Sequence, residues 1–285
     1  MTRAKRRRLT DRLFASLCLG AAALSVAMLL LLLGKILLDG MGRLSFDFVA
    51  KGLSSRPIRT GIFPAIMGSL WTMALTALVA VPLGVAAAVY LEEFQTRRSR
   101  LTRIVQLSIA NLAGVPSIVY GLLGLAVFVR GAGMGSSVLA GALTLGLLIL
   151  PTVILVTQEA LRAVPRAYRE ASLGLGVTTW GTIRHQVLPN AAPGILTGLI
   201  LALSRAIGET APLVVVGAVV GVVSSPSSPD DRYTALPVQI FNWARDSKPG
   251  FHDAAAAAIV VLMAALLLMN SVAIVLRNRA QKRLS

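Results

Sequence analysis

The sequence has few charged residues, still fewer acidic residues and almost no cysteine. Only 14% of its 285 residues are charged and 55% are apolar, whereas an average soluble domain has roughly 25% charged residues. This balance excludes an ordinary soluble globular protein. The single cysteine, Cys18, cannot form an internal disulfide, which excludes a disulfide-stabilised scaffold.

The sequence also lacks a phosphate-binding loop and an internal repeat. No segment has the G-x-x-x-x-G-K-[ST] pattern, whose backbone amides and lysine bind nucleotide phosphates. We therefore expect the chain to bind no cofactor and to perform no covalent chemistry, so that any ATPase activity comes from another polypeptide. The absence of a regular period excludes a soluble repeat array.

Long apolar runs dominate what is present. A run of about 20 apolar residues is enough to cross a bilayer as a helix. The first run is longer than the core of a signal peptide, so we expect an uncleaved span. The sequence predicts an all-α integral membrane protein with six transmembrane helices in one domain, 13–276. The runs are 13–38, 64–91, 104–129, 138–157, 195–223 and 254–276.

The net charge of +16 comes from basic residues beside the runs, which indicates membrane topology and lipid headgroup contacts and excludes a nucleic-acid partner. Lysine and arginine near span ends mark the cytoplasmic side, so both basic tails, 1–12 and 277–285, are expected in the cytoplasm. The first outer loop, with Arg43, Lys51, Arg56 and Arg59, weakens this count without reversing it. Eighteen of the 28 basic residues lie in the two tails and at Arg97, Arg98, Arg100, Arg103, Arg162, Arg166, Arg169 and Arg184.

Polar and helix-breaking residues interrupt the third run. Asn111 and Ser117 flank a Gly-Val-Pro sequence at membrane depth. Glycines in this run and the next permit close helix packing, and the two polar residues either hydrogen-bond between helices or line a pathway. The last outer loop, 224–253, is rich in Ser, Pro and Asp, which predicts turns and surface exposure.

The insert 158–193 is too polar to cross a bilayer. Its composition favours a helix up to Leu173 with a turn or kink at Pro165. Gly174 and Gly176 then stop the helix, and Thr178 or Thr179 caps a second short helix that we expect to end near Pro189. The insert is thus a helix–turn–helix, although an amphipathic helix lying on lipid, with arginines on headgroups, is an alternative.

The fifth run carries a charged pair, Arg205 and Glu209, at the i, i+4 spacing that places two side chains on one helix face. Charges at this depth generally face a bundle interior or a watery cavity. The pair either neutralises itself and fixes packing, or forms a pathway or gate with Thr210, Asn111 and Ser117. In the second case Arg205 guides an oxyanion, while Glu209 holds Arg205 or closes the gate.

The insert resembles the EAA loop of permease subunits in binding-protein-dependent ABC importers. It departs from that loop at Ser172, where alanine is usual, and at Gln186, where an aliphatic residue is usual. The resemblance implies a coupling helix that docks on a cytoplasmic ATPase. The residues that carry it are Glu170, Ala171, Ser172, Gly176, Leu188 and Pro189.

The segment 204–213, S-R-A-I-G-E-T-A-P-L, resembles the PstA-type phosphate permease family, as do segments 112–121, 81–84 and 91–94. This resemblance implies the permease fold of a type I ABC importer in the bacterial cell (inner) membrane. It also implies alternating access and three partners: a homologous second permease, an ATPase dimer that uses ATP-Mg, and an extracytoplasmic phosphate-binding protein. The alternatives are a sulfate or molybdate importer, an ion-gradient-driven secondary transporter and a non-transporting membrane scaffold.

Overall fold

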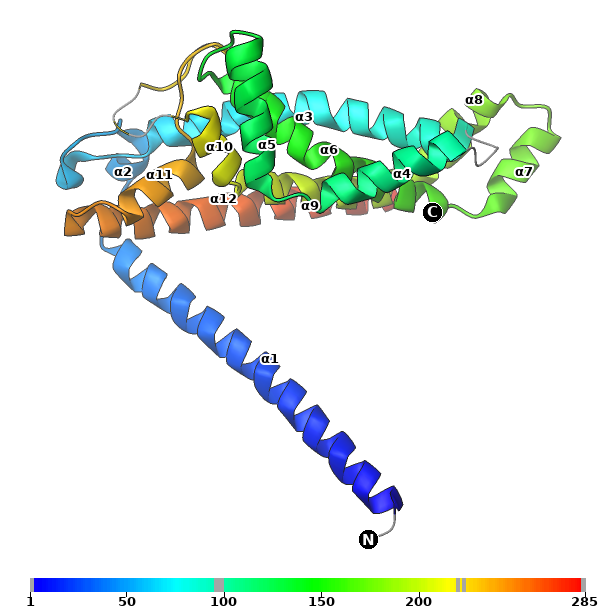
Figure 1. The fold of residues 1–285 in the computed structure, drawn as a ribbon, viewed down its shortest axis with the longest axis horizontal. Helices are drawn as coiled ribbons and strands as arrows, with labels where there is room; N and C mark the ends of the chain where they lie inside the picture. The colour runs from blue at the N-terminus through cyan, green and yellow to red at the C-terminus, as the bar shows by residue number, and fades with distance from the viewer. Residues whose placement is uncertain (1–2, 95–99, 219–220, 222–223, 283–285) are drawn as a thin grey trace.

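Four long helices lie side by side in the bundle of the computed structural model, which describes residues 3–94, 100–218, 221 and 224–282 (Figure 1). Glycines allow close approach between them, because a Cβ on Gly84 or Gly198 would meet Val153 or Val156 of α6 within 3.0 Å. The helices α3, α6 and α9 are therefore packed as one slab. The four helices are α3 (Phe63–Val89), α6 (Val138–Arg162), α9 (Leu188–Ile207) and α12 (Pro249–Lys282).

The first helix, α1 (Arg3–Met41), projects away from this bundle (Figure 1). It meets α12 near its own end, where a Cβ on Gly40 would lie 2.9 Å from the backbone of Ala256. Its apolar side chains from residue 11 onward are mostly exposed in the isolated chain. Exposure of a long apolar helix is what a lipid environment requires.

Among the described residues, five helical segments are long and apolar enough to cross a membrane, and a bent pair of helices makes a sixth when it is counted as one span. The expected third span corresponds to this bent pair and is not one straight helix. It consists of α4 (Arg100–Ala113) and α5 (Ser117–Gly124), which continues as the π-helical η3 (Leu125–Gly131), with a bend of 103°. Pro116 caps α5 and has no N–H to continue α4.

The fifth span begins earlier and ends earlier than 195–223. The segments α8 (Thr179–Thr182), η4 (Ile183–Val187, a π-helical turn) and α9 form one helical segment, Thr179–Ile207. The expectation that the helix capped by Thr178 ends near Pro189 is wrong, because proline is tolerated in the first turn of α9. Gly208 separates α9 from α10 (Ala211–Val216). Residues 219–220 and 222–223, in the expected end of this span, lie outside the described residues, as do Arg97, Arg98, 1–2 and 283–285.

Short helices gather at the two ends of the bundle (Figure 1). The α7 and α8 helices lie at one end, here named the coupling end, and α2 and α11 lie at the other, here named the loop end. The remaining bounds are α2 (Phe46–Ala50), η1 (Pro57–Arg59), η2 (Tyr90–Phe94, π-helical), α7 (Arg166–Gly174) and α11 (Leu236–Ala244).

The segment between α10 and α11 is partly buried, which corrects the expectation of surface exposure. Tyr233 and Thr234 have no exposed surface, since Gly68 of α3 and Gly141 of α6 leave room for them. The segment also caps α6, because its carbonyls at positions 231 and 229 accept hydrogen bonds from the N–H groups of Val138 (3.1 Å) and Leu139 (2.9 Å). These donors have no partner within the helix.

Asp231 holds the turn that presents these carbonyls. Its Oδ2 accepts hydrogen bonds from the N–H groups of Ser227 and Ser228, both at 2.8 Å, and from the Ser227 hydroxyl at 2.9 Å. These bonds, those from the two backbone N–H groups first, lower the pKa of Asp231. A lowered folded-state pKa stabilises the turn above the unfolded-state pKa, and this contribution is lost as the pH falls through the folded-state value.

We expect Asp231→Asn at neutral pH to lower hydrogen-exchange protection of the Val138 and Leu139 amides by about tenfold or more, the size expected for lost hydrogen bonds to a charged acceptor. Wild-type protein should show the same loss as the pH falls through the lowered pKa of Asp231, which lies below the ordinary aspartate value of about 4. The control is Asp230→Asn, because the Asp230 side chain accepts no bond in this turn. Equal protection in the Asp231 and Asp230 variants would contradict this role.

Candidate coupling and translocation site

The α7–α8 segment at the coupling end is a helical hairpin, as the sequence predicts. Pro165 begins α7, which ends at Gly174, and Gly176 then reverses the chain with a φ of +81°. Glycine adopts this left-handed conformation without a Cβ clash. Thr178 caps α8, since its hydroxyl accepts a hydrogen bond from the Gly181 N–H at 3.2 Å.

The residues expected to dock an ATPase do not share one surface. Glu170 and Ala171 are exposed on α7, whereas Ser172 is buried and its hydroxyl hydrogen-bonds to that of Thr182 at 2.9 Å. Ser172 therefore fastens α7 to α8, a role that alanine lacks. Leu188 and Pro189 lie in the first turn of α9 instead of on the hairpin, and Leu188 packs against the core between α3 and α6.

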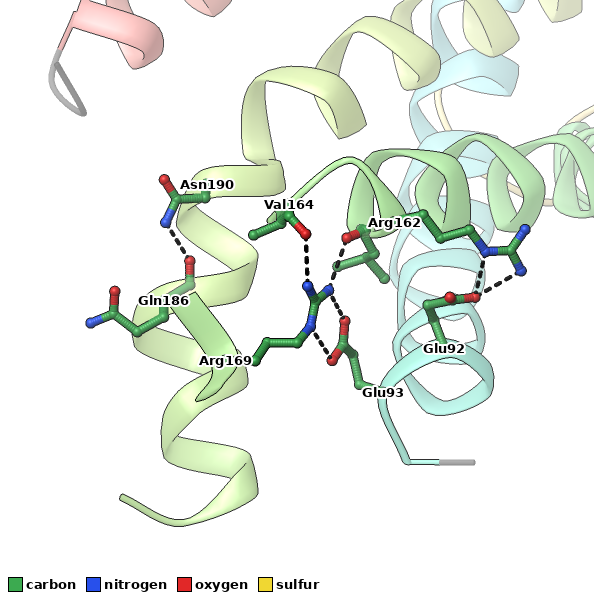
Figure 2. A network of polar contacts seen from close by, with 8 residues as sticks. Glu92, Glu93, Arg162, Val164, Arg169, Gln186 and Asn190 are labelled. Atoms are coloured by element: carbon green, nitrogen blue, oxygen red, sulfur yellow. Dashed lines mark hydrogen bonds and ion pairs between the residues drawn. The ribbon is translucent and has the colours of Figure 1, made fainter. Parts of the chain in front are cut away.

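Gln186, which stands where the EAA loop usually has an aliphatic residue, is exposed. No packing contact within this chain therefore depends on an aliphatic side chain at this position. Its backbone carbonyl accepts a hydrogen bond from the Asn190 amide at 2.6 Å (Figure 2). The apolar contacts of this turn come from its neighbours Ile183 and Val187, which are fully buried.

Two ion pairs join η2, the π-helical turn at the end of α3, to α6 and α7 (Figure 2). Nη2 of Arg162 lies 2.8 Å from Oε2 of Glu92, and Nη2 of Arg169 lies 2.6 Å from Oε1 of Glu93. The hydrogen bond to Glu93 raises the pKa of Arg169. Sequence reasoning treated these arginines as topology or headgroup residues and missed the pairs, although two consecutive glutamates at the end of an apolar run were a signal.

The second candidate site lies where α9 ends. Arg205 Nε is 3.5 Å from Glu209 Oε1, so the two residues pair as expected. However, Glu209 lies beyond the helix, because α9 ends at Ile207 and the N–H of Glu209 bonds to the carbonyl of Ala206 at 3.2 Å. The Arg205 side chain is 60% exposed, against 17% for Glu209. Its remaining donors therefore face open space in the isolated chain.

The breaks in the third and fifth spans meet. A Cβ on Gly121 of α5 would lie 2.8 Å from the Cα of Pro212 in α10, and Val115 and Tyr120 pack in one apolar cluster with Ala206. The Tyr120 hydroxyl donates to the carbonyl of Leu112 at 2.8 Å, which satisfies one group freed by the break.

The other expected pathway residues lie beside these breaks without joining the charged pair. Asn111 is exposed, Ser117 begins α5 half-buried, and Thr210 precedes α10, also half-buried. In the described part of the chain, none of the three side chains hydrogen-bonds to Arg205 or Glu209. Of the five expected pathway residues, the structure therefore pairs Arg205 with Glu209 and leaves Asn111, Ser117 and Thr210 beside the breaks in the third and fifth spans.

The comparisons with known proteins agree with this architecture. The chain is 37% identical over 207 residues to the probable ABC transporter permease protein YqgI of Bacillus subtilis, covering 73% of this chain and 70% of that protein. It is 34% identical over 209 residues to the phosphate transport system permease protein PstA of Xylella fastidiosa, and this match covers 73% of this chain and 72% of that protein. Identity reaches 42% over 165 residues with PstA 1 of Mycobacterium tuberculosis (strain ATCC 25618 / H37Rv), covering 58% of this chain and about half, 53%, of that protein.

Solved structures share the fold. A bacterial ABC transporter that imports the acidic polysaccharide alginate matches with a TM-score of 0.65 at 15% identity, covering 98% of this chain and 99% of that one. The MetNI methionine ABC transporter matches with a TM-score of 0.61 at 19% identity, and this match covers 80% of this chain and 99% of that one. A family model also matches residues 80–285. With most of its length matched in this way, the chain belongs to the family of binding-protein-dependent transport system inner membrane components.

Proposed function

We propose that the chain is the transmembrane permease subunit of an ATP-driven importer of inorganic phosphate. The observation that carries this proposal is the capped α7–α8 hairpin, which presents Glu170 and Ala171 at one end of a bundle from a transport family. Phosphate as the substrate is supported by the PstA relatives at 34–42% identity.

The coupling end is assigned to the cytoplasm. Arg162, Arg166, Arg169 and Arg184 lie there, and basic residues mark the cytoplasmic side. The C-terminal end of α12 lies toward the same end (Figure 1). With an even number of spans, we expect both termini in the cytoplasm and the loop end outside, where an extracytoplasmic phosphate-binding protein would deliver its cargo.

The hairpin is the docking surface for a separate ATPase dimer, which supplies ATP-Mg hydrolysis. Glu170 is exposed, and no cation within the described residues pairs with it. Its carboxylate is thus available to a basic side chain of the ATPase. Closure of the ATPase dimer moves the hairpin and reorients the spans of this chain and of a homologous second permease, which is alternating access.

Arg205 provides a weak, transient contact for the phosphate anion. Its guanidinium carries five N–H donors, and the ion pair with Glu209 uses one nitrogen. The Glu209 charge cancels part of the positive potential and would repel a phosphate dianion, so tight binding is not expected. Weak binding suits a permease, because a tightly held anion would not be released.

Reconstitution tests this function. We expect proteoliposomes that contain the chain, the second permease and the ATPase to take up radiolabelled phosphate when phosphate-loaded binding protein and ATP are both supplied. Uptake should stop when the ATPase subunit is omitted, and excess sulfate or molybdate should not compete. Uptake without the ATPase would indicate a gradient-driven transporter, and competition by sulfate or molybdate would indicate a different oxyanion importer.

A further inference from the structure

The guanidinium of Arg169 links three helices at the coupling end (Figure 2). It donates to both carboxylate oxygens of Glu93, from Nε at 3.1 Å and from Nη2 at 2.6 Å. It also donates to the backbone carbonyls of Leu161 at 2.9 Å and Val164 at 2.8 Å. One side chain of α7 thereby holds the end of α3 and the last turn of α6.

These bonds lock the connection between α6 and α7. The two carbonyls belong to the last turn of α6 and to the short loop before Pro165. Helix-end carbonyls have no partner within the helix, and a bidentate guanidinium–carboxylate pair fixes orientation as well as distance. Without Arg169, α7 would be tied to the bundle by this loop and by its contacts with α8 and η4, and no longer to Glu93.

The neighbouring ion pair, Glu92 with Arg162, is more exposed to solvent than the pair of Glu93 with Arg169. The side chains of Glu93 and Arg169 are 8% and 21% exposed, whereas those of Glu92 and Arg162 are 21% and 54% exposed. Exposed pairs contribute little, because solvent screens them. Arg162 is itself part of α6, so its pair joins α3 to α6, which are already packed together, and does not involve α7.

We propose that Arg169 is a positioning residue that fixes the orientation of α7 on α3 and α6, so that movement of the hairpin is transmitted to these spans. The orienting role stands on the contacts of this chain alone. Its consequence for transport rests on the proposed function. Loss of Arg169 should leave ATP hydrolysis in place while α7 moves without carrying α3 and α6 with it.

The first measurement is structural and needs no transport. Cys18→Ser removes the single cysteine, and spin labels at Leu175→Cys and Leu83→Cys, both exposed positions, report the distance between the hairpin and α3 in the complex with cysteine-free partners. We expect Arg169→Gln and Glu93→Gln to widen the distance distribution at least about twofold, as a rigid link becomes a hinge. The control Glu92→Gln should match the unsubstituted protein. An unchanged distribution in Arg169→Gln would overturn the proposal.

The second measurement is the ratio of phosphate transported to ATP hydrolysed in proteoliposomes. Arg169→Gln and Glu93→Gln should each lower this ratio about fivefold or more, the low end of typical coupling effects. The double variant should be no worse than either single variant, because the two residues act through one contact. Arg169→Lys should recover part of the loss, since lysine keeps the charge and loses the bidentate geometry.

The two measurements separate the two ideas. Widened distances with no ATP-dependent transport in the unsubstituted complex would support the orienting role and refute the proposed function. A normal transport ratio in Arg169→Gln, in a complex that does transport, would refute transmission through Arg169 and leave the proposed function intact.

Discussion

Arg205→Ala is expected to lower phosphate transport about tenfold or more in the assembled complex, because one or two charge-assisted hydrogen bonds to the passing anion are lost. The Arg205 side chain is 60% exposed and pairs with Glu209 through Nε alone, so most of its donors are available to an anion. Arg205→Lys should fall between the alanine variant and the wild type, since lysine retains the charge without the planar fork. The measurement is the initial rate of binding-protein-dependent phosphate uptake in proteoliposomes.

Glu209→Gln tests whether Glu209 holds Arg205 in place. If it does, the glutamine amide oxygen still accepts a hydrogen bond from Arg205, and phosphate transport should fall only a few-fold. The matched control is Arg56→Ala, which removes an exposed arginine at the loop end, far along the chain from the pair. Wild-type uptake by both Arg205 variants in intact complexes would show that the pair serves packing alone.

Gly68→Ala is expected to destabilise the fold by about 1–3 kcal/mol, the usual effect of overpacking a close contact. A Cβ at this position would overlap the backbone carbonyl oxygen of Thr234, and a backbone atom cannot turn aside as a flexible side chain can. Thr234 and Tyr233 would be displaced, and with them the carbonyls that cap α6. The measurement is the unfolding midpoint in detergent micelles.

Gly20→Ala is the matched control, because Gly20 also lies inside an apolar helix and, apart from the adjacent residues and backbone of that helix, no atom lies within 4 Å of the added Cβ. Alanine favours a helix interior over glycine by about 0.5–1 kcal/mol, so this variant should be equal to or more stable than the wild type. Gly141→Ala should resemble Gly68→Ala, since its Cβ would overlap the Tyr233 hydroxyl. A Gly68→Ala protein as stable as Gly20→Ala would refute the packing role of the buried loop.

The sequence predicted the helices, helix breaks, turns and caps, because each of these depends on residues that are close together along the chain. The apolar runs became helices, the Gly-Val-Pro sequence that ends at Pro116 became a break, and Gly176 and Thr178 formed the turn and cap of the hairpin. Each of these outcomes follows from a missing N–H, a missing Cβ or a nearby hydroxyl, which are properties that the sequence displays directly.

Contacts between distant residues could not be predicted in this way. The polar composition of the last outer loop indicated exposure, yet Tyr233 and Thr234 are buried because glycines on two other helices leave space for them. Ser172 departs from the alanine that is usual at its position, and only the fold shows that its hydroxyl hydrogen-bonds to that of Thr182 at 2.9 Å. Neither partner is marked by spacing along the chain.

The sequence by itself determined that this is an all-helical membrane protein with six spans and a capped hairpin, because hydropathy and helix signals are local. The tertiary structure alone decided which charges pair across distant parts of the sequence and how far each pair is buried. Arg169 and Glu93 are 76 positions apart and meet at 2.6 Å, whereas Arg205 stays exposed beside Glu209. That distinction depends on how the helices pack, and it separates an arginine held by four hydrogen bonds from one whose side chain is 60% exposed.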